Sequence, residues 1–293
     1  MSIFEKYWEK FVKPMDDKRI PTLRVPRVIE QNNIAYANSE HRLQLLDVYS
    51  PVDAQGLMPT IVDIHGGGWY YGDKDLNKIY CLNLAERGMR VVNISYRLTP
   101  EVDLKNQVKD IFCALNFIYD NAENYGIDIN NLFLTGDSAG AHLASMVANV
   151  LDDPSAQEAF GVSSKIRFNA IAYTCAAFNI ARLATTPIVK SYFKPILGKA
   201  KNNPLLPYVD YRPNLGSTPS LFITCDGDFM KNQTITGYEE YKSFGNDAEL
   251  IYFDKASQTN KLAHVYNITQ TDWPEAIETN DKTIAFFRKY IVK

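Results

Sequence analysis

A serine between two glycines is the residue of this sequence best suited to covalent chemistry. Ser138 lies in the segment Gly136–Gly140, directly after the apolar run Leu132–Leu134, and Ala141–Ala148 has helical composition and spacing. A strand that turns sharply through glycines into a helix exposes a serine hydroxyl at the top of a sheet. The pattern predicts that Ser138 is a nucleophile, although Gly-x-Ser-x-Gly also occurs by chance in loops.

Such a serine needs a base, and the chain holds only four histidines. After a nucleophile turn of this type the acid and then the histidine follow along the chain, which excludes His41 and His65. His142 lies one helical turn past Ser138, where its ring does not readily swing back to the hydroxyl. His264 remains, in a loop after the last predicted strand. Loop histidines are usually only polar surface, but elimination of the other three predicts that His264 is the base.

Two carboxylates follow the apolar segment Leu221–Cys225 and are candidates for the acid that orients this histidine. Asp226 comes directly after the segment, so it can also serve as a structural brace of the turn. Asp228 lies beyond Gly227 and has the freer reach, and we favour it. Asp254, at the end of the next predicted strand, is a weaker competitor.

A run of three glycines follows the apolar segment Pro59–Ile64 and His65. Acyl transfer places negative charge on the carbonyl oxygen in the transition state, and backbone N–H groups free of side chains can approach that oxygen closely. We expect the amides of Gly66 and Gly67, together with that of Ala139, to form an oxyanion hole. His65 is expected to hold this loop in place.

The alternative for these glycines is a turn that binds the pyrophosphate of a dinucleotide. Gly66 and Gly68 fit that spacing, but Tyr71 stands where the third glycine belongs, so the fingerprint fails. No phosphate loop of the Walker type occurs either. Trp69, Tyr70 and Tyr71 after the glycines are candidates for the wall of an acyl or alcohol pocket, or else for core positions.

The elements that must position these residues alternate between strands and helices. A polar turn over Asn38–Glu40 separates the first two strands, which we place at a sheet edge. The alternation predicts an α/β fold with a mostly parallel sheet and helices on both faces. Strands are predicted over Arg27–Ala37, Leu43–Tyr49, Pro59–Ile64, Arg90–Tyr96, Leu132–Leu134, Ala170–Thr174, Pro219–Cys225 and Glu249–Phe253, and helices over Asp75–Arg87, Asp103–Asn121 and Pro274–Tyr290.

One segment, residues 176–217, breaks the alternation. It is too long for a plain connection and, with its aromatic residues and prolines, too apolar for a disordered one. We expect it to form a cap over the carboxyl edge of the sheet that encloses a limited pocket. An amphipathic helix near residues 1–25, predicted to end near Pro14, joins this cap. The interpretation is a single domain over residues 1–293.

The composition is typical of a folded protein whose partner is a small molecule. The chain has 293 residues, of which 46% are hydrophobic and 22% charged, and a net charge of −3. Without a cluster of basic residues it favours neither nucleic acid nor an anionic membrane as a partner. The N-terminus lacks the apolar core of a signal peptide, and we expect a cytoplasmic protein. The oligomeric state stays open, with a homodimer as one arrangement.

The four cysteines lie far apart in apolar surroundings, which is typical of free buried thiols and not of a disulfide frame or a zinc site. We therefore expect no metal. Their positions are Cys81, Cys113, Cys175 and Cys225.

Taken together, these residues resemble the α/β-hydrolases of the hormone-sensitive-lipase-like branch of carboxylesterases. The resemblance implies an eight-stranded sheet, a helical cap made partly from the N-terminus, no cofactor, and hydrolysis of esters with small or medium acyl groups. It also implies that the acid stands at the position of Asp228. The matching residues are His65–Trp69, Ser95–Glu101, Gly136–Gly140, Asp228 and His264.

The sequence departs from that family pattern at Ala141-His142, where many members have Gly-Asn, and at Thr224–Gly227 before the acid. The expected activity is that of a serine carboxylesterase, in which Ser138 attacks an ester carbonyl, His264 takes the proton and Asp228 holds the ring. Two alternatives stay open. One is a binding protein of the same fold without turnover, and the other is a peptidase or amidase.

Overall fold

The computed structural model describes residues 3–19, 25, 27–183, 186–197, 206–212 and 216–293. In this part of the chain eight strands form one sheet in the order β1-β2-β4-β3-β5-β6-β7-β8. The strand β2 pairs antiparallel with β1 and β4, and all other neighbours pair in parallel. The predicted α/β fold with a mostly parallel eight-stranded sheet is confirmed. The strands are β1 Val28–Ala35, β2 Leu45–Pro51, β3 Met58–Ile64, β4 Arg90–Ile94, β5 Ile127–Asp137, β6 Ala170–Thr174, β7 Ser220–Cys225 and β8 Ala248–Phe253.

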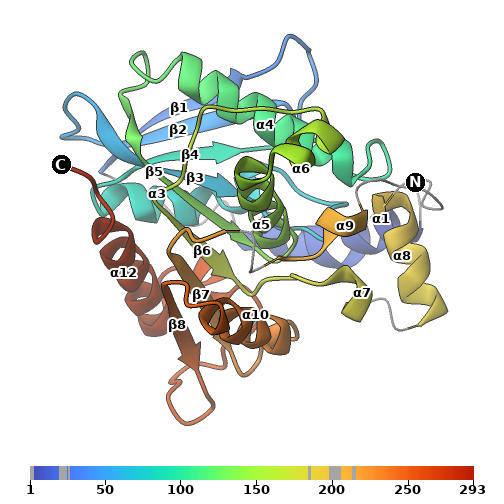
Figure 1. Cartoon of the computed structure of the whole chain (residues 1–293). Helices are drawn as coiled ribbons and strands as arrows, with labels where there is room; N and C mark the ends of the chain where they lie inside the picture. Colours follow the sequence, from blue (N-terminus) through green and yellow to red (C-terminus); the bar gives the residue numbers. More distant parts are fainter. Residues whose placement is uncertain (1–2, 20–24, 26, 184–185, 198–205, 213–215) are drawn as a thin grey trace.

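Helices cover both faces of the sheet (Figure 1). One hydrophobic core lies between the sheet and α4, α5, α6 and α10, and a second lies between the sheet and α3, α11 and α12. Strand side chains alternate between the two, so that Leu132 and Leu134 enter the first core and Phe133 enters the second. The helices are α3 Lys78–Glu86, α4 Leu104–Asp120, α5 Ala139–Asp152, α6 Pro154–Phe160, α10 Lys231–Ser243, α11 Tyr266–Thr269 and α12 Pro274–Arg288.

The N-terminal helical segment is longer than predicted. It does not end near Pro14 but continues as α1 Ile3–Tyr7, the π-helical turn η1 Trp8–Val12 and α2 Lys13–Arg19. Pro14 comes just after the π-helical turn, whose wider hydrogen-bond spacing lets the helical chain pass a residue that lacks the N–H of the regular ladder. Our prediction of the end point was therefore wrong.

The predicted helix over Asp75–Arg87 is interrupted at Asn77. A 3₁₀ turn, η3 Lys74–Leu76, comes first, and α3 begins after Asn77. The side chain of Asn77 donates hydrogen bonds to Asp63 and Asp137, which lie at the carboxyl ends of β3 and β5. A tertiary contact thus breaks the helix where local propensity would have continued it.

The segment predicted as a cap contains three short helices, α7 Ile180–Leu183, α8 Pro187–Leu197 and α9 Leu206–Val209. Parts of the predicted cap, residues 20–24, 26, 184–185, 198–205 and 213–215, lie outside the described residues. Figure 1 shows α8 and α9 at the same end of the molecule as the N-terminal helices. The ring centroids of Phe4 in α1 and Tyr192 in α8 are 4.8 Å apart, and the two rings meet edge to face. The helices α1 and α8 therefore pack together.

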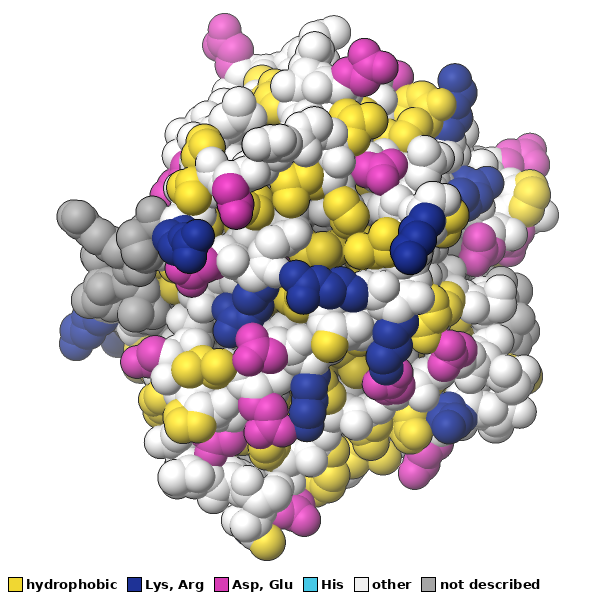
Figure 2. Space-filling model, turned by 90° about the vertical axis from the view of Figure 1, so that its left-hand side faces the viewer, with side chains coloured by type: hydrophobic (Ala, Val, Ile, Leu, Met, Phe, Trp, Pro, Cys, Tyr) yellow, Lys and Arg dark blue, Asp and Glu magenta, His cyan; other side chains and the backbone are white. Residues whose placement is uncertain are grey.

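On the face shown in Figure 2, Lys and Arg side chains are interspersed with Asp and Glu side chains and with small hydrophobic areas. Within the residues that the structure describes, no helix combines the length and the apolar sequence needed to cross a bilayer.

Candidate active site

The turn between β5 and α5 places Ser138 in an unusual backbone conformation. Its φ of 52° and ψ of −116° are rarely adopted by a residue with a side chain, and such strain is concentrated at functional sites. The two neighbouring glycines allow it. A Cβ at Gly140 would collide with the carbonyl oxygen of Ile64, and one at Gly136 would press on Gly140 itself. The sheet and α5 therefore approach closely enough to present the Ser138 hydroxyl, which is partly exposed.

Three side chains from separate loops meet at this hydroxyl. Ser138 Oγ lies 2.9 Å from His264 Nε2, and His264 Nδ1 lies 2.6 Å from Asp228 Oδ1. With a neutral ring, Nδ1–H donates to the carboxylate and Nε2 accepts from the serine. The structure thus brings together the three residues that sequence reasoning selected as nucleophile, base and acid.

The carboxylate of Asp228 is buried but well supplied with donors. Its Oδ2 accepts from Thr224 Oγ1 at 2.7 Å, and its Oδ1 also accepts from the backbone N–H of Met230 at 2.8 Å. Burial by itself would raise the pKa of Asp228, but the hydrogen bonds from His264, Thr224 and Met230 hold it below its ordinary value. Asp228 is therefore ionised at neutral pH and can stabilise a positive charge on His264.

The two competing acids have other partners. Asp226 accepts hydrogen bonds from Lys231 Nζ, Tyr252 Oη and the Lys255 N–H. The ion pair with Lys231, followed by these hydrogen bonds, lowers the pKa of Asp226. Asp254 accepts from the N–H groups of a turn over residues 254–257. Both act as braces of loops, the alternative role that the sequence left open for Asp226.

The oxyanion loop, residues 65–71 between β3 and η3, corrects one sequence prediction. The N–H of Gly66 donates to Asp137 Oδ1 at 2.8 Å, so this amide is already engaged and cannot bind an oxyanion. Within the described part of the chain, the N–H groups of Gly67 and Gly68 have no hydrogen-bond acceptor. Ala139 is the first residue of α5, and its N–H has no acceptor within the helix. The expectation for Gly66 is wrong, whereas the N–H of Gly68, which sequence reasoning did not select, is available.

A buried pair of carboxyl groups supports this loop. Asn77 Nδ2 donates both to Asp63 Oδ2 at 2.9 Å and to Asp137 Oδ1 at 2.8 Å. Burial, reinforced by the neighbouring Asp137 charge, raises the pKa of Asp63 to about 8. Of the pair, Asp63 is thus the group that binds a proton more readily, while Asp137 Oδ1 holds the N–H of Gly66.

The segment after β4 braces the same loop from another side. Tyr96 Oη donates to the carbonyl of His65 at 2.8 Å, and the two rings stack with centroids 4.4 Å apart. Thr99 N and Gln107 Nε2 both donate to the carbonyl of Trp69. The segment Ser95–Glu101, known at first only as a family resemblance, thus supports the oxyanion loop.

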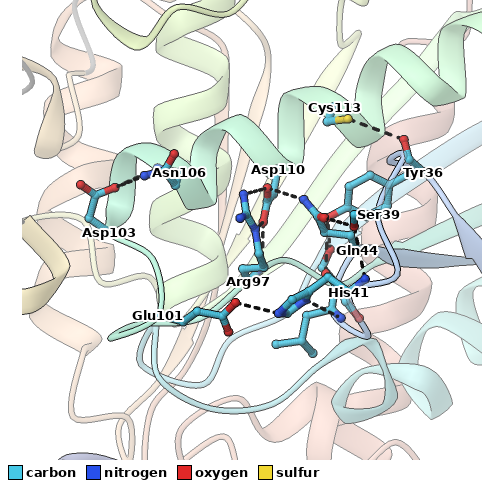
Figure 3. A network of polar contacts seen from close by, with 12 residues as sticks. Tyr36, Ser39, His41, Gln44, Arg97, Glu101, Asp103, Asn106, Asp110 and Cys113 are labelled. Carbon is cyan, nitrogen blue, oxygen red and sulfur yellow. Dashed lines mark hydrogen bonds and ion pairs between the residues drawn. The ribbon is translucent and has the colours of Figure 1, made fainter.

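A polar network keeps that bracing segment in place. Arg97 forms two side-chain hydrogen bonds with the buried Asp110 of α4, through Nε at 2.8 Å and Nη2 at 2.7 Å. Figure 3 shows Asp110 between Arg97 and Gln44, whose Nε2 donates to Oδ1 at 2.8 Å. His41 pairs with Glu101 at 2.8 Å beside this network. The partner of His41 is therefore Glu101 and not Ser138.

The aromatic residues after the glycines serve mainly as packing. Trp69 and Tyr70 are only 3% and 5% exposed. Trp69 Nε1 donates to His142 Nδ1 at 3.3 Å, while His142 Nε2 donates to the carbonyl of Val209. Burial lowers the pKa of His142 to about 4, so this ring is neutral and structural. These contacts favour core positions over the suggested substrate contacts of Trp69 and Tyr70.

The helix α8 is tied to the oxyanion loop by two hydrogen bonds in opposite directions. Tyr192 Oη donates to the carbonyl of Gly68 at 2.6 Å, and Tyr70 Oη donates to the carbonyl of Tyr192 at 2.7 Å. Trp8 stacks on Tyr71 with ring centroids 5.4 Å apart. A cavity of about 730 Å³ along the loop is lined by Trp8, Tyr70 and Tyr71. Ser138, Asp228 and His264 do not line it.

Residues 46–209, more than half of the chain, match the family model BD-FAE. Esterase B from Lactobacillus rhamnosis, solved with a tributyrin phosphonate, is 30% identical over 98% of this chain and 94% of its own, with a TM-score of 0.92. The carboxylesterase EstE1 from a metagenomic library is 17% identical over 100% of this chain and 99% of its own, with a TM-score of 0.75, and shows likeness of fold alone.

Curated relatives match over a shorter stretch. The probable isoprenylcysteine alpha-carbonyl methylesterase ICMEL1 of Oryza sativa subsp. japonica is 38% identical over 100 residues, 34% of this chain and 24% of that protein. Arylacetamide deacetylase of Bos taurus is 40% identical over 97 residues, 31% of this chain and 24% of that protein. These alignments span about a quarter of the relatives' own length.

Proposed function

Because the chain belongs to the BD-FAE family, among the hormone-sensitive-lipase-like carboxylesterases of the α/β-hydrolase fold, we propose that it is a serine carboxylesterase. The observation that carries this proposal is the continuous hydrogen-bonded chain from Ser138 through His264 to Asp228. A nucleophile within hydrogen-bond reach of a base, and a base oriented by a carboxylate, is the arrangement that acyl transfer requires.

In the proposed reaction Ser138 Oγ attacks the ester carbonyl while its proton passes to His264 Nε2. The imidazolium that forms is stabilised by Asp228, which stays ionised. The negative charge on the former carbonyl oxygen is bound by the N–H groups of Gly67, Gly68 and Ala139. His264 then gives its proton to the departing alcohol, and an acyl-enzyme remains.

Deacylation repeats these steps with water as the nucleophile. His264 takes a proton from water, the hydroxide attacks the acyl carbonyl, and Ser138 leaves with the proton from His264. The carboxylic acid is released, and the resting hydrogen bonds re-form. Apart from the ester and water, the proposed steps use only groups of this chain.

The proposed substrates are small esters with short or medium acyl groups. The names of the relatives support this class, since they include a methylesterase, a deacetylase and an esterase solved with a C4 tributyrin phosphonate. We propose further that α1, η1, α2 and α7–α9 cap a single domain over residues 1–293. The hydrogen bonds between α8 and the oxyanion loop support this, since they link the capping helices to the reacting groups.

The test is hydrolysis of a chromogenic short-chain ester, combined with labelling by a serine-directed phosphonate. We expect turnover by the wild type, and one phosphonyl group on the peptide that contains Ser138. The Ser138→Ala variant should lose roughly 10⁶-fold in rate and remain unlabelled while its unfolding curve is unchanged. Substantial activity left in pure Ser138→Ala would refute the nucleophile.

The same assay separates the alternative functions. A binding protein of this fold would neither turn over the ester nor take up the phosphonate. A peptidase or amidase would also hydrolyse a matched anilide, at a rate well above that of the Ser138→Ala variant, and that result would replace the carboxylesterase proposal.

A further inference from the structure

The thiol of Cys175 lies beside the proposed catalytic residues but has no part in their reaction. Cys175 follows β6, is completely buried, and its Sγ accepts a hydrogen bond from the N–H of Val265 at 3.2 Å. Val265 is the neighbour of His264 in sequence, so this bond ties the end of β6 to the loop of the base. The Cys175 Sγ, a carboxylate oxygen of Asp228 and a ring nitrogen of His264 all lie within 4.8 Å of one another.

These three groups form a mixed donor set that is typical of one class of metal ion. Thiolate, imidazole and carboxylate together suit zinc and similar thiophilic divalent cations, whereas magnesium and calcium prefer oxygen ligands. Bond lengths of about 2.0–2.3 Å place the donor atoms of a tetrahedral zinc site roughly 3–4 Å apart. The observed spacing within 4.8 Å therefore needs only small side-chain movements.

We propose that Cys175, Asp228 and His264 form an inhibitory site for a zinc-type cation, with water as the fourth ligand. The proposal rests on the proposed function, because the ion would occupy His264 Nδ1, the nitrogen through which Asp228 orients the ring in the proposed reaction. The cation takes the lone pair of His264 Nδ1, and the ring proton moves to Nε2. The thiol of Cys175 releases its proton to solvent. Nε2 then carries a hydrogen and cannot accept the proton of Ser138.

The surroundings of His264 provide a route for the ion. The side chain of His264 is 18% exposed. Phe229 packs over its ring at a centroid distance of 4.1 Å and is itself 73% exposed, so it can swing aside without disturbing the core. The wide separation of these three residues along the chain explains why the cysteine spacing did not suggest a metal site.

The first experiment measures hydrolysis of a short chromogenic ester at buffered concentrations of free Zn²⁺. Each variant is compared with its own metal-free rate. We expect zinc to inhibit the wild type reversibly and Mg²⁺ to have no effect. Cys175→Ala, and the nearly isosteric Cys175→Ser, should raise the inhibition constant for zinc at least about tenfold, since loss of a group that supports a metal site typically costs 10–100-fold in affinity.

Cys225→Ala is the matched control. This cysteine is also buried near the site, but its Sγ contacts the carbonyl of Ala263 and does not belong to the cluster. It should respond to zinc like the wild type. Equal zinc inhibition in the wild type and both Cys175 variants would overturn the proposal.

The second experiment detects the metal without catalysis. Co²⁺ added to Ser138→Ala protein should produce the intense absorption band of a thiolate–cobalt bond, and Zn²⁺ should displace it. The band should be missing in Ser138→Ala/Cys175→Ala. The band in Ser138→Ala protein, combined with no ester hydrolysis by the wild type, would refute the proposed function and leave the metal site standing. A protein that hydrolyses esters but shows no band would refute the metal site alone.

Discussion

Asp226 and Asp228 leave the same strand two residues apart, yet they face different groups. The first binds Lys231 and Tyr252 on the outside of the loop, and the second is buried against His264. Gly227 lies between them, and a Cβ at its position would collide with the carbonyl of Leu262 in the neighbouring loop. The close approach of the two loops at this glycine brings Asp228 within reach of the base.

The two carboxylates give a matched pair of variants. Asp228→Asn should lower the rate of ester hydrolysis by roughly 10⁴, because an amide partner favours the wrong tautomer of His264. Asp226→Asn should cost far less, since that side chain does not contact the base. Rates of both pure variants, with unfolding curves as the check on folding, decide the point. A loss confined to Asp226→Asn would overturn the assignment of the acid.

Gly67 has a backbone that only glycine adopts without strain. Its φ is +106°, and a Cβ would collide with the backbone carbonyl of Tyr71. Gly67→Ala should therefore displace the proposed oxyanion donors and lower kcat by at least roughly 10². Gly56→Ala is the control, because Gly56 also has a positive φ, of +62°, but nothing within 4 Å of a Cβ. Equal rates for the two variants would mean that Gly67 serves the turn alone.

At the scale of elements, the loop that carries His264 is anchored by the start of α12. Glu275, in the first turn of that helix, accepts hydrogen bonds from the N–H groups of Thr259 and Asn260 and from Asn260 Nδ2. Burial would raise the pKa of Glu275, but these hydrogen bonds lower it from 4.5 to about 2. A carboxylate near a helix N-terminus is also favoured by the helix dipole. The loop of His264, the proposed base, is thus held by a helix outside the site.

Loss of this anchor should appear as a pH-dependent loss of stability. Glu275→Gln should lower the free energy of unfolding at pH 7 by about 1.5–3 kcal/mol, the value of hydrogen bonds to a charged group. Because the folded state depresses this pKa, the stabilisation is complete above about pH 4.5 and declines as the pH falls toward 2. Urea unfolding of wild type and variant between pH 7 and 3 should show the difference shrinking.

Glu278→Gln on the same helix is the control. Glu278 forms an exposed ion pair with Lys282, and such pairs contribute about 0–1 kcal/mol. A difference between wild type and Glu275→Gln that stayed constant down to pH 3 would contradict the role given to the Glu275 charge.

At the scale of the whole molecule, α1 and α8, which lie far apart in the sequence, meet at the oxyanion loop. Tyr192 of α8 binds the carbonyl of Gly68, 124 residues earlier in the sequence, and Phe4 of α1 packs on Tyr192. Aromatic side chains from three segments thus surround the oxyanion loop. We propose that this setting limits the room beside Ser138 for a long acyl chain.

We therefore expect preference for short acyl groups. In a series of chromogenic esters from two to sixteen carbons, kcat/KM should be highest at the short end and fall steadily with length. Rates in Ser138→Ala protein correct for background hydrolysis. A maximum at the longest chains would show that the capping helices do not limit the pocket.

The sequence by itself determined the succession of the eight strands along the chain and selected Ser138, Asp228 and His264, which the structure brings together. Apolar runs of strand length alternate with helical patterns, and this alternation requires a parallel sheet whose strand ends share one edge. Ser138, Asp228 and His264 each follow a predicted strand. Their meeting at that edge is therefore a consequence of the topology, and elimination among four histidines sufficed to select His264, the one that contacts Ser138 Oγ.

Only the tertiary structure decided which groups surround Ser138, Asp228 and His264. The engagement of Gly66 by Asp137, the approach of Cys175 to Asp228 and the bond from Tyr192 to Gly68 all join segments far apart in sequence. No local pattern encodes such contacts, because they depend on how strands and loops lie side by side after folding. Pro14 and Asn77 also contradicted local expectations. The helical chain continues through Pro14 after a π-helical turn, whereas contacts with a buried carboxyl pair interrupt the helix at Asn77.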